Sequence, residues 1–470
     1  MWTSINQALN IIDNFVWGVP LMVLIIAGGL LLTIRLGLLQ IRKLPLALKW
    51  MLQNEEGGKG EISSFSALCT ALSATIGTGN IVGVATAVCA GGPGALFWMV
   101  VAAFLGMATK YSEGLLAVKY RTVAEDGHSL GGPFYYIELG MGKNFKWLAK
   151  IFAFFGVCVG LFGIGTFSQV NGISSAVHGF FDPNDVFTVK ILPFLGEYSW
   201  SVVIASLILS FCVAAVLIGG VKRIASVSQI IVPFMAVIYF VFAVILICCN
   251  ITKVPAAFAT IVTAAFSPKA ITGGAVGSML IAMQKGVARG IFSNEAGLGS
   301  APIAAAAAQT NSPVRQGLVS MTGTFIDTII ICTLTGLSIV LTGAWQVEGL
   351  EGVQVTTYAF QHGLPFPAQF SSFILMLCLV FFAFTTILGW DYYSERCLEY
   401  LSGGNMKHVK IFRWIYILAV FIGPYMTVSA VWTIADIFNG LMAIPNMIAL
   451  FALSGVIVKE TRAFFQHAKE

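Results

Sequence analysis

The sequence predicts an all-α integral membrane protein with about eleven transmembrane helices, ten of them arranged as two inverted sets of five. Three observations lead to this prediction. Hydrophobic residues make up 57% of the 470 residues and charged residues only 10%, whereas soluble domains average about 25% charged residues. Apolar runs of about 20 residues recur along the whole chain. Two of the predicted spans are also interrupted by helix-breaking residues at matching positions.

The first interrupted span covers residues 62–90. Its centre, Ala74–Gly83, contains three glycines, two threonines and an asparagine. Each glycine costs about 1 kcal/mol relative to alanine inside a helix, and unpaired backbone groups in hydrocarbon cost several kcal/mol more. Such a segment is stable where its freed backbone groups line a cavity and meet a solute. The opposed half-helix ends would suit a zwitterion beside a cation; the alternative is a glycine-rich face for close helix packing.

The second interrupted span covers residues 254–292, which is too long for a single crossing. It is broken by Ser267-Pro268 and by the run Gly273–Gly277. Because each set contains five spans, an odd number, the second set must begin on the opposite side of the membrane. Two broken helices at matching positions of inverted halves indicate a secondary transporter with its site at the membrane midplane. Channels and membrane enzymes do not require this pairing.

The chain divides into four predicted regions. Residues 1–61 contain an additional N-terminal helix and a cytoplasmic loop, residues 62–250 and 254–458 form the two five-helix repeats, and residues 459–470 form a cytoplasmic tail. The predicted spans are 14–35, 62–90, 94–118, 147–178, 199–219, 224–250, 254–292, 315–343, 369–394, 411–431 and 433–458.

Basic residues set the predicted orientation. If the N-terminus faces outside, nearly all of the 26 Lys and Arg residues fall in cytoplasmic segments. The exceptions are Lys110, which lies within a span, and Lys190, Lys253 and Lys269. This asymmetry follows the positive-inside rule, so the net charge of +5 reflects topology and gives no reason to expect nucleic acid as a partner.

Isolated polar residues inside other spans are candidates for the site. Gln169 and Asn171 lie in the middle of a span, where amides either join helices or face a substrate cavity. Thr386 and Trp390 are four residues apart and share a helical face; the alternative is a threonine bonded to its own helix and an interfacial tryptophan. Asp327 is the one acid placed deep within a predicted span, which makes it a functional candidate and a possible proton site.

Enzymatic and metal-binding alternatives have little support. The nine cysteines contain no CxxC pair and the five histidines no HExxH or HxxxH spacing, so we interpret the cysteines as packing residues. A membrane enzyme would need a nucleophile and base or a metal cluster. A channel would need a continuous polar lining, which these spans do not show.

Several motifs resemble those of one known family. They are Gly77–Ala87, Gly91–Met99, Gly106–Glu113, Gly131–Ile137 and Gly286–Gly297. Together they resemble the alanine/glycine:cation symporters, and they extend over most of the chain. The resemblance implies eleven spans, an N-terminal helix outside the repeat, and the inverted five-helix fold of the bacterial leucine transporter. It also implies inward transport of small neutral amino acids with Na⁺ or sometimes H⁺.

The resemblance also implies the site residues. Thr78, Gly79 and Asn80 would surround the substrate carboxylate. The backbone of Gly274–Gly277 (including Ala275), with Gln169, Thr386 and Trp390, would surround the rest of the ligand. A Na⁺ site would use carbonyls near Thr75–Gly77 with the hydroxyls of Thr385 and Thr386.

The sequence therefore predicts a symporter for alanine or glycine driven by Na⁺, which is a coupling ion and not a cofactor. Glutamine or serine uptake on the same scaffold and H⁺-coupled symport stay open as alternatives. We expect a monomer in a lipid bilayer, multi-pass in the plasma membrane of a prokaryote. The N-terminus would face outside and the C-terminus the cytoplasm.

Overall fold

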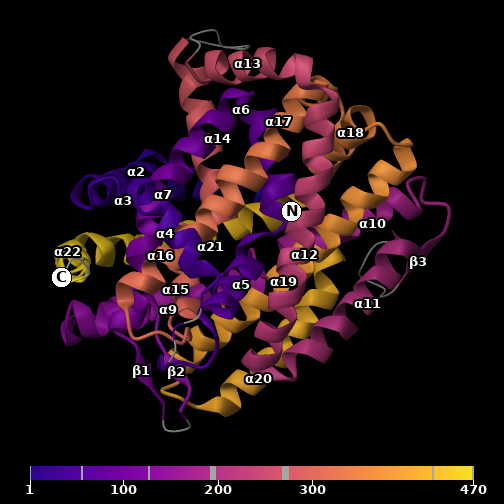
Figure 1. Cartoon of the computed structure of the whole chain (residues 1–470). Coiled ribbons are helices and arrows are strands. Elements are labelled where there is room, and N and C mark those ends of the chain that lie inside the picture. Colours follow the sequence, from indigo (N-terminus) through magenta and orange to yellow (C-terminus); the bar gives the residue numbers. More distant parts are fainter. Residues whose placement is uncertain are drawn as a thin grey trace.

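The computed structural model describes residues 2–53, 55, 57–124, 127–190, 197–266, 275–425 and 428–467. Helices account for most of this part of the chain (Figure 1). Its strands form two short antiparallel pairs, β1 (Thr122–Val123) with β2 (Ser129–Leu130) and β3 (Thr188–Lys190) with β4 (Glu197–Ser199).

The first half of the chain carries the N-terminal helices and the first interrupted span. Its helices are α1 (Trp2–Val16), α2 (Val19–Arg35), α3 (Leu39–Arg42), α4 (Leu44–Met51), α5 (Ser64–Thr75), the π-helix η1 (Gly79–Gly83), α6 (Val84–Gly91), α7 (Gly94–Lys119), α8 (Pro133–Tyr135), the π-helix η2 (Tyr136–Gly140), the 3₁₀-helix η3 (Lys143–Phe145), α9 (Lys146–Phe162), α10 (Phe167–Phe181), α11 (Trp200–Leu217) and α12 (Gly220–Cys249).

The second half repeats the pattern of long helices joined by short ones. Its helices are the 3₁₀-helix η4 (Ile251–Lys253), α13 (Val254–Phe266), α14 (Ala275–Asn294), α15 (Ala301–Ala305), α16 (Pro313–Thr324), the π-helix η5 (Phe325–Cys332), α17 (Thr333–Thr342), the 3₁₀-helix η6 (Ala344–Gln346), α18 (Val353–Gly363), α19 (Ala368–Leu401), α20 (Met406–Ile422), the 3₁₀-helix η7 (Gly423–Tyr425), α21 (Val428–Ala452) and α22 (Ser454–His467).

Within the described residues, eight helices are long and apolar enough to cross a membrane, or nine if one bent pair counts as a single span. The bent pair is Ser64–Thr75 with Gly79–Gly91, which turns by 51°. The all-α membrane class predicted from composition is thereby confirmed. The count of eleven spans, the two inverted sets of five and the region boundaries stay predictions.

The core of the molecule is built around α7. This helix packs against α14 and α16 and also contacts α2 and α13. Gly286 of α14 permits the close approach, because a Cβ atom there would lie 2.2 Å from the carbonyl oxygen of Ala95. Small residues at such crossings let helices meet backbone to backbone, as is usual in membranes.

The predicted span 254–292 contains two separate helices. Figure 1 shows α13 running across the top of the molecule, while α14 descends separately toward the centre. The predicted breaks at Ser267-Pro268 and at Gly273 and Gly274 lie outside the described residues, whereas Ala275 and Gly277 belong to the regular helix α14. The second interruption that the structure describes comes later, between α14 and α15.

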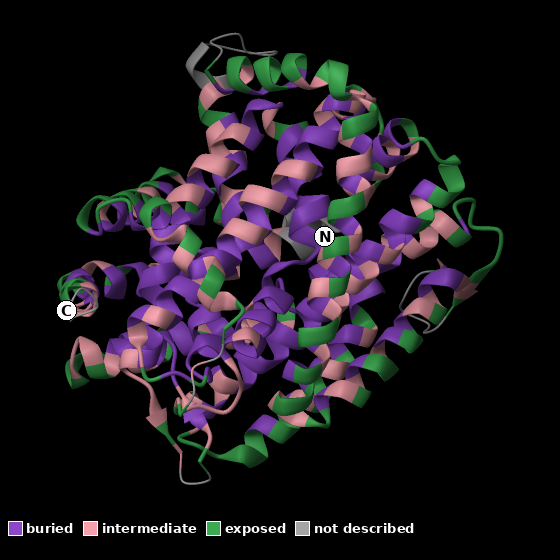
Figure 2. Cartoon of the chain, in the orientation of Figure 1, coloured by how far each residue is buried: buried purple, intermediate pink, exposed green. Residues whose placement is uncertain are grey.

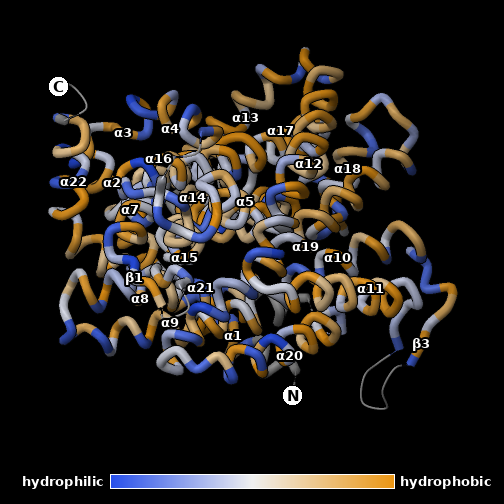
Figure 3. Tube along the Cα trace, turned by 60° about the horizontal axis from the view of Figure 1, so that its bottom comes forward, coloured by the Kyte–Doolittle hydropathy of each residue, from blue (hydrophilic) through white to orange (hydrophobic). Residues whose placement is uncertain are grey.

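Exposed apolar side chains cover the outer helices, while polar side chains lie inside. Figure 2 shows buried residues filling the centre and exposed ones along the peripheral helices, and hydrophobic residues predominate along α11 and α12 in Figure 3. Large apolar side chains such as Phe211 on α11 and Ile230 on α12 are exposed. Asn80, Glu295 and Asp327 are fully buried. This arrangement is the one that a lipid solvent favours.

The predicted orientation can be tested by cysteine labelling. Val186, between α10 and α11, is 82% exposed and Leu52, after α4, is 71% exposed. In a variant without the nine native cysteines, we expect Val186→Cys to react with a membrane-impermeant maleimide in intact cells. Leu52→Cys should react only after permeabilisation, because the basic residues nearby place it inside. The reverse pattern would overturn the orientation.

Candidate functional site

The first interrupted span breaks where the sequence predicts. Helix α5 ends at Thr75, the next residue, Ile76, has extended backbone angles (φ −79°, ψ 98°), and η1 begins at Gly79. The side chain of Asn80 compensates for the break, since its Oδ1 accepts a hydrogen bond of 2.9 Å from the backbone N–H of Gly77. The C-terminal end of α5 and the N-terminal end of η1 therefore meet at this buried break with opposite partial charges.

Two other helices place side chains at this break. Gln169 of α10 accepts the backbone N–H of Thr78 at 3.0 Å, and Thr386 of α19 donates its hydroxyl to the carbonyl of Ile76 at 3.1 Å. A Cβ atom at Gly77 would lie 2.5 Å from the Thr386 hydroxyl and 2.9 Å from Gln169 Oε1. The structure thus brings together Gly77, Thr78, Asn80, Gln169 and Thr386.

A further interruption separates α9 from α10. Residues 163–166 are not helical, and Gln169 Nε2 donates a 2.9 Å hydrogen bond to the carbonyl of Ile164. The same amide therefore joins this interruption to the first break. The prediction placed Gln169 in the middle of a continuous span, but the glycines at 163 and 165 end the helix before it.

The second break lies at Glu295–Ser300, between α14 and α15. Glu295 has a positive φ of 57°, and Gly297 and Gly299 have φ values of 91° and 81°. These left-handed conformations end the helix, and glycine adopts them without strain. The Glu295 side chain accepts the indole N–H of Trp390 at 2.8 Å and the hydroxyl of Ser300 at 2.6 Å.

The predicted ligand-binding segment Gly274–Gly277 lies at the other end of α14, and its role stays a prediction. Gly274 lies outside the described residues, and Ala275 and Gly277 form the first turn of α14. The opposite end of α14 reaches the first break, because a Cβ atom at Gly79 would lie 3.1 Å from the Cα of Ser293. With a rise of about 1.5 Å per residue, Ala275 lies about 27 Å farther along the helix.

Asp327 joins the two broken spans. It accepts hydrogen bonds from Asn80 Nδ2 at 2.6 Å and from the Ser293 hydroxyl at 2.9 Å, and a third from Thr328 at 2.6 Å. It lies in η5, a π-helical turn inside a span that the sequence predicts as regular. Because Asn80 caps Gly77, the carboxylate of Asp327 orients the group that stabilises the first break.

A second buried carboxylate, Glu113 of α7, holds the second break. Its Oε1 accepts the backbone N–H of Gly297 at 3.1 Å and Asn446 Nδ2 at 2.6 Å. Asn446 of α21 also donates to the Gly297 carbonyl at 2.9 Å and accepts from Tyr136. The sequence analysis gives Glu113 no role, because it lies near the end of the predicted span 94–118. Two glycines two residues apart, at positions 297 and 299, were the available signal for the break.

Comparison with known proteins identifies the family. The sequence model of the sodium:alanine symporter family matches residues 2–470. The chain belongs to the sodium:alanine symporter family. It is 55% identical over 467 residues to an uncharacterized transporter of Haemophilus influenzae, covering 99% of this chain and 97% of the relative.

Two further relatives carry more specific names. The chain is 46% identical to the sodium/alanine symporter AgcS of Methanococcus maripaludis, covering 97% of this chain and 96% of that protein. It is 36% identical to the probable sodium/glutamine symporter GlnT of Bacillus subtilis, covering 100% and 92%. Members of this family are transporters and not enzymes, so the site described above has to bind and release its ligands without covalent chemistry.

The hydroxyl groups predicted to bind Na⁺ in this symporter form hydrogen bonds with different partners. Thr386 reaches the Ile76 carbonyl beside Gly77, as described above. The Thr385 hydroxyl donates to the carbonyls of Phe381 and Phe382 and lies 3.5 Å from Met235 Sδ on α12. The Thr75 hydroxyl donates to the Ala71 carbonyl at 2.6 Å. Of these three hydroxyls, the one at the first break is therefore that of Thr386, which is shared between the carbonyls of Ile76 (3.1 Å) and Phe382 (3.0 Å).

The segments that connect the symporter's two broken spans to the predicted cytoplasmic side lie beside each other. Ile62, before α5, forms a parallel bridge with Ala308, after α15. Arg121, which follows α7, donates to the carbonyls of Ala306 (3.2 Å), Ala308 (2.8 Å), Thr310 (2.5 Å) and Lys59 (2.8 Å). One guanidinium thus fastens the entry of the first broken span to the exit of the second.

Proposed function

We propose that this chain imports alanine or glycine together with Na⁺ across the plasma membrane. The observation that supports this most directly is the convergence of Gly77, Thr78, Gln169 and Thr386 at the first break. Transport then requires only a shift of population between states open to either side, biased by ligand contacts.

The polarity of the break suits an amino acid. The N-terminal end of η1, at Thr78, Gly79 and Asn80, carries partial positive charge and would attract the substrate carboxylate. The C-terminal end of α5 carries partial negative charge and would attract a cation or the substrate ammonium. Na⁺ prefers oxygen ligands, and carbonyls near Thr75–Gly77 with the hydroxyls of Thr385 and Thr386 would supply them. Thr385 would have to change its present hydrogen bonds to take part.

The crowding around Gly77 supports a small substrate. Side-chain oxygens of Thr386 and Gln169 approach to within 3 Å of where a single added methyl group would lie. On the same face of α19, one turn beyond Thr386, the fully buried indole of Trp390 occupies the space beside the second break. We therefore propose that Trp390 excludes larger side chains.

Replacing Trp390 tests this size selection. We expect Trp390→Ala to weaken alanine uptake through lost packing and to raise leucine uptake relative to alanine by at least about tenfold, the scale on which pocket volume discriminates. Trp390→Phe is the matched control, because it keeps an aromatic ring in this space but cannot donate a hydrogen bond to Glu295. Both ratios are measured with labelled amino acids in proteoliposomes. An unchanged ratio in Trp390→Ala would assign Trp390 to packing alone.

Counterflow with a panel of labelled amino acids tests the function as a whole. Proteoliposomes loaded with alanine should accumulate external alanine and glycine when Na⁺ is present and should lose this activity when choline replaces Na⁺. Accumulation of glutamine in preference to alanine would favour the activity named for the relative GlnT. Accumulation that follows a pH gradient and ignores Na⁺ would favour H⁺ coupling.

A further inference from the structure

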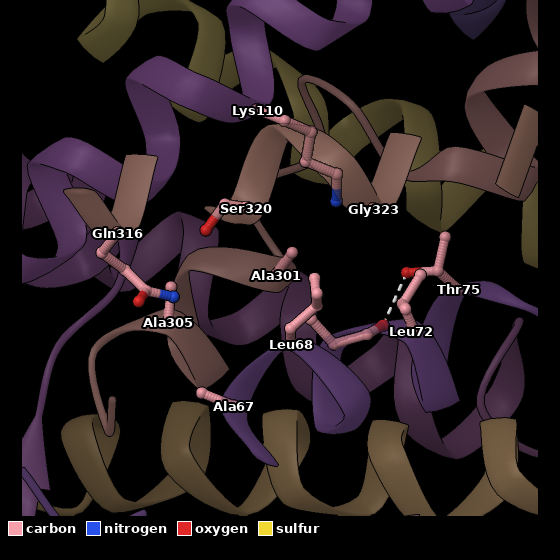
Figure 4. A pocket seen from close by; sticks show the side chains of 11 residues that line it. Ala67, Leu68, Leu72, Thr75, Lys110, Ala301, Ala305, Gln316, Ser320 and Gly323 are labelled. Atoms are coloured by element: carbon pink, nitrogen blue, oxygen red, sulfur yellow. Dashed lines mark hydrogen bonds between the residues drawn. The ribbon is translucent and has the colours of Figure 1, made fainter. Parts of the chain in front are cut away.

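Lys110 of α7 is a buried basic residue. It is 3% exposed, and its Nζ has no hydrogen-bond partner among the residues that the structure describes. Figure 4 shows it extending toward the space between Ser320, Leu72 and Thr75. That cavity, with a volume of about 10 Å³, has room for roughly one water molecule. Gln316 Oε1, on the opposite wall, is also buried and unpartnered.

Lys110 shares the interior of the protein with three buried carboxylates. Lys110 interacts electrostatically with Glu113, Glu295 and Asp327, all of them fully buried. Each carboxylate accepts its hydrogen bonds from neutral donors, as described above, and none of these bonds comes from Lys110. The ammonium therefore contributes charge to the cluster without being fixed to one member of it. Charges this deep in a membrane protein are expensive and commonly functional.

Lys110 and the end of the helix before the first break line the same cavity. Thr75, the last residue of α5, lines the cavity that Lys110 faces. The negative end of the α5 dipole therefore acts on the ammonium from one side. The next carbonyl along the chain, that of Ile76, is the one that Thr386 contacts. A cation bound at that carbonyl and the Lys110 ammonium would occupy neighbouring places at the same helix end.

We propose that Lys110 is a built-in cation that weakens Na⁺ binding at the first break and so allows Na⁺ to leave. This proposal rests on the proposed Na⁺ coupling. Like charges in a partly dry interior repel appreciably: at an effective dielectric constant of about 20, unit charges up to about 10 Å apart weaken each other's binding more than tenfold. Lys110 acts through charge and needs no contact with the ion.

The test is the Na⁺ dependence of alanine binding in proteoliposomes. We expect Lys110→Met, which keeps the length of the side chain, to lower the half-saturating Na⁺ concentration about tenfold. Uptake should slow because Na⁺ release slows. Loss of a purely structural residue would weaken Na⁺ binding instead. Lys119→Met is the matched control, because Lys119 lies on the same helix and pairs with Glu460 at 2.7 Å, away from both breaks.

A double variant separates charge from folding. Lys110→Met leaves the carboxylates without their cation and can fail to fold, whereas Lys110→Met with Glu113→Gln restores the net charge of the cluster. The double variant should fold and return the half-saturating Na⁺ concentration toward that of the parent. The proposal would be overturned if Lys110→Met bound Na⁺ as weakly as the parent or more weakly. It would also be overturned if the double variant had the same half-saturating Na⁺ concentration as Lys110→Met. A parent protein that binds alanine equally in choline would instead overturn Na⁺ coupling itself.

Discussion

Replacing Arg121 with glutamine is expected to open the predicted cytoplasmic side of the molecule. Its guanidinium donates to four carbonyls, one before the first broken span and three after the second. Hydrogen bonds to charged groups contribute about 1.5–3 kcal/mol each. A net loss of only about 2 kcal/mol would shift a two-state equilibrium about thirtyfold. Glutamine can replace only part of the bonding, because it lacks the charge and the planar five-donor fork.

The measurement is the rate at which a cysteine reacts when it is placed at a buried position of the first broken span. Ala67, near the start of α5, is 1% exposed. The protein is first stripped of its native cysteines, given Ala67→Cys and placed in inside-out vesicles. We expect this cysteine to react with an impermeant maleimide at least about tenfold faster in the Arg121→Gln variant than in the protein that retains Arg121. Alanine uptake should fall, because the state open to the outside loses population. Lys119→Gln is the control, since it removes a neighbouring cation that contacts neither broken span. Equal rates with and without Arg121 would show that other contacts close this side.

The first break was predictable because its chemistry is local. Gly77, Gly79 and Asn80 lie within four residues, and no continuous helix in lipid accommodates such a sequence without partners. Residue type alone left two readings of the partners from distant helices, and the resemblance placed Gln169 and Thr386 around the ligand. The structure places both side chains at the break, where polar side chains in a membrane find polar groups; their contact with a ligand stays a prediction.

The break at Glu295–Ser300 was not predicted, for a related reason. The run at 273–277 is richer in glycine than Glu295–Ser300, so local helix propensity favours the former. Glu295, Gly297 and Gly299 are instead stabilised by tertiary contacts from Glu113, Trp390 and Asn446, which come from three other helices. A single sequence does not show which distant donors face a segment, and these donors decide where a helix can break.

The role of Asp327 was ambiguous from sequence. An intramembrane acid is a functional candidate by default, and H⁺ coupling was one of its possible uses. The structure shows that its carboxylate accepts hydrogen bonds from three donors, one of which, Asn80, caps the first break. Lys110, by contrast, appeared in the sequence only as an exception to the charge pattern. Its significance emerges from its burial and from its electrostatic interaction with three buried carboxylates.

Two substitutions distinguish Na⁺ coupling at Thr386 from H⁺ coupling at Asp327. Thr386→Val keeps the shape of the side chain and removes the hydroxyl that meets the Ile76 carbonyl. If Na⁺ binds there and joins the two halves, Na⁺ and alanine each tighten the binding of the other, typically by about 5- to 150-fold. We expect Thr386→Val to lose most of this enhancement when alanine binding is measured at fixed pH, in Na⁺ and in choline.

Asp327→Asn is the matched variant in the same experiment. Asparagine retains one acceptor oxygen but turns an amide N–H toward donors, so we expect lower stability, by about 1–3 kcal/mol for each donor left unpaired. The ratio of alanine affinities in Na⁺ and in choline should nevertheless stay close to that of the parent, because Asp327 supports Asn80 and does not itself hold the ion. If Asp327→Asn abolished the Na⁺ effect while Thr386→Val kept it, the coupling site would move to Asp327. Binding that followed pH in the parent and lost that dependence in Asp327→Asn would identify the coupled ion as a proton.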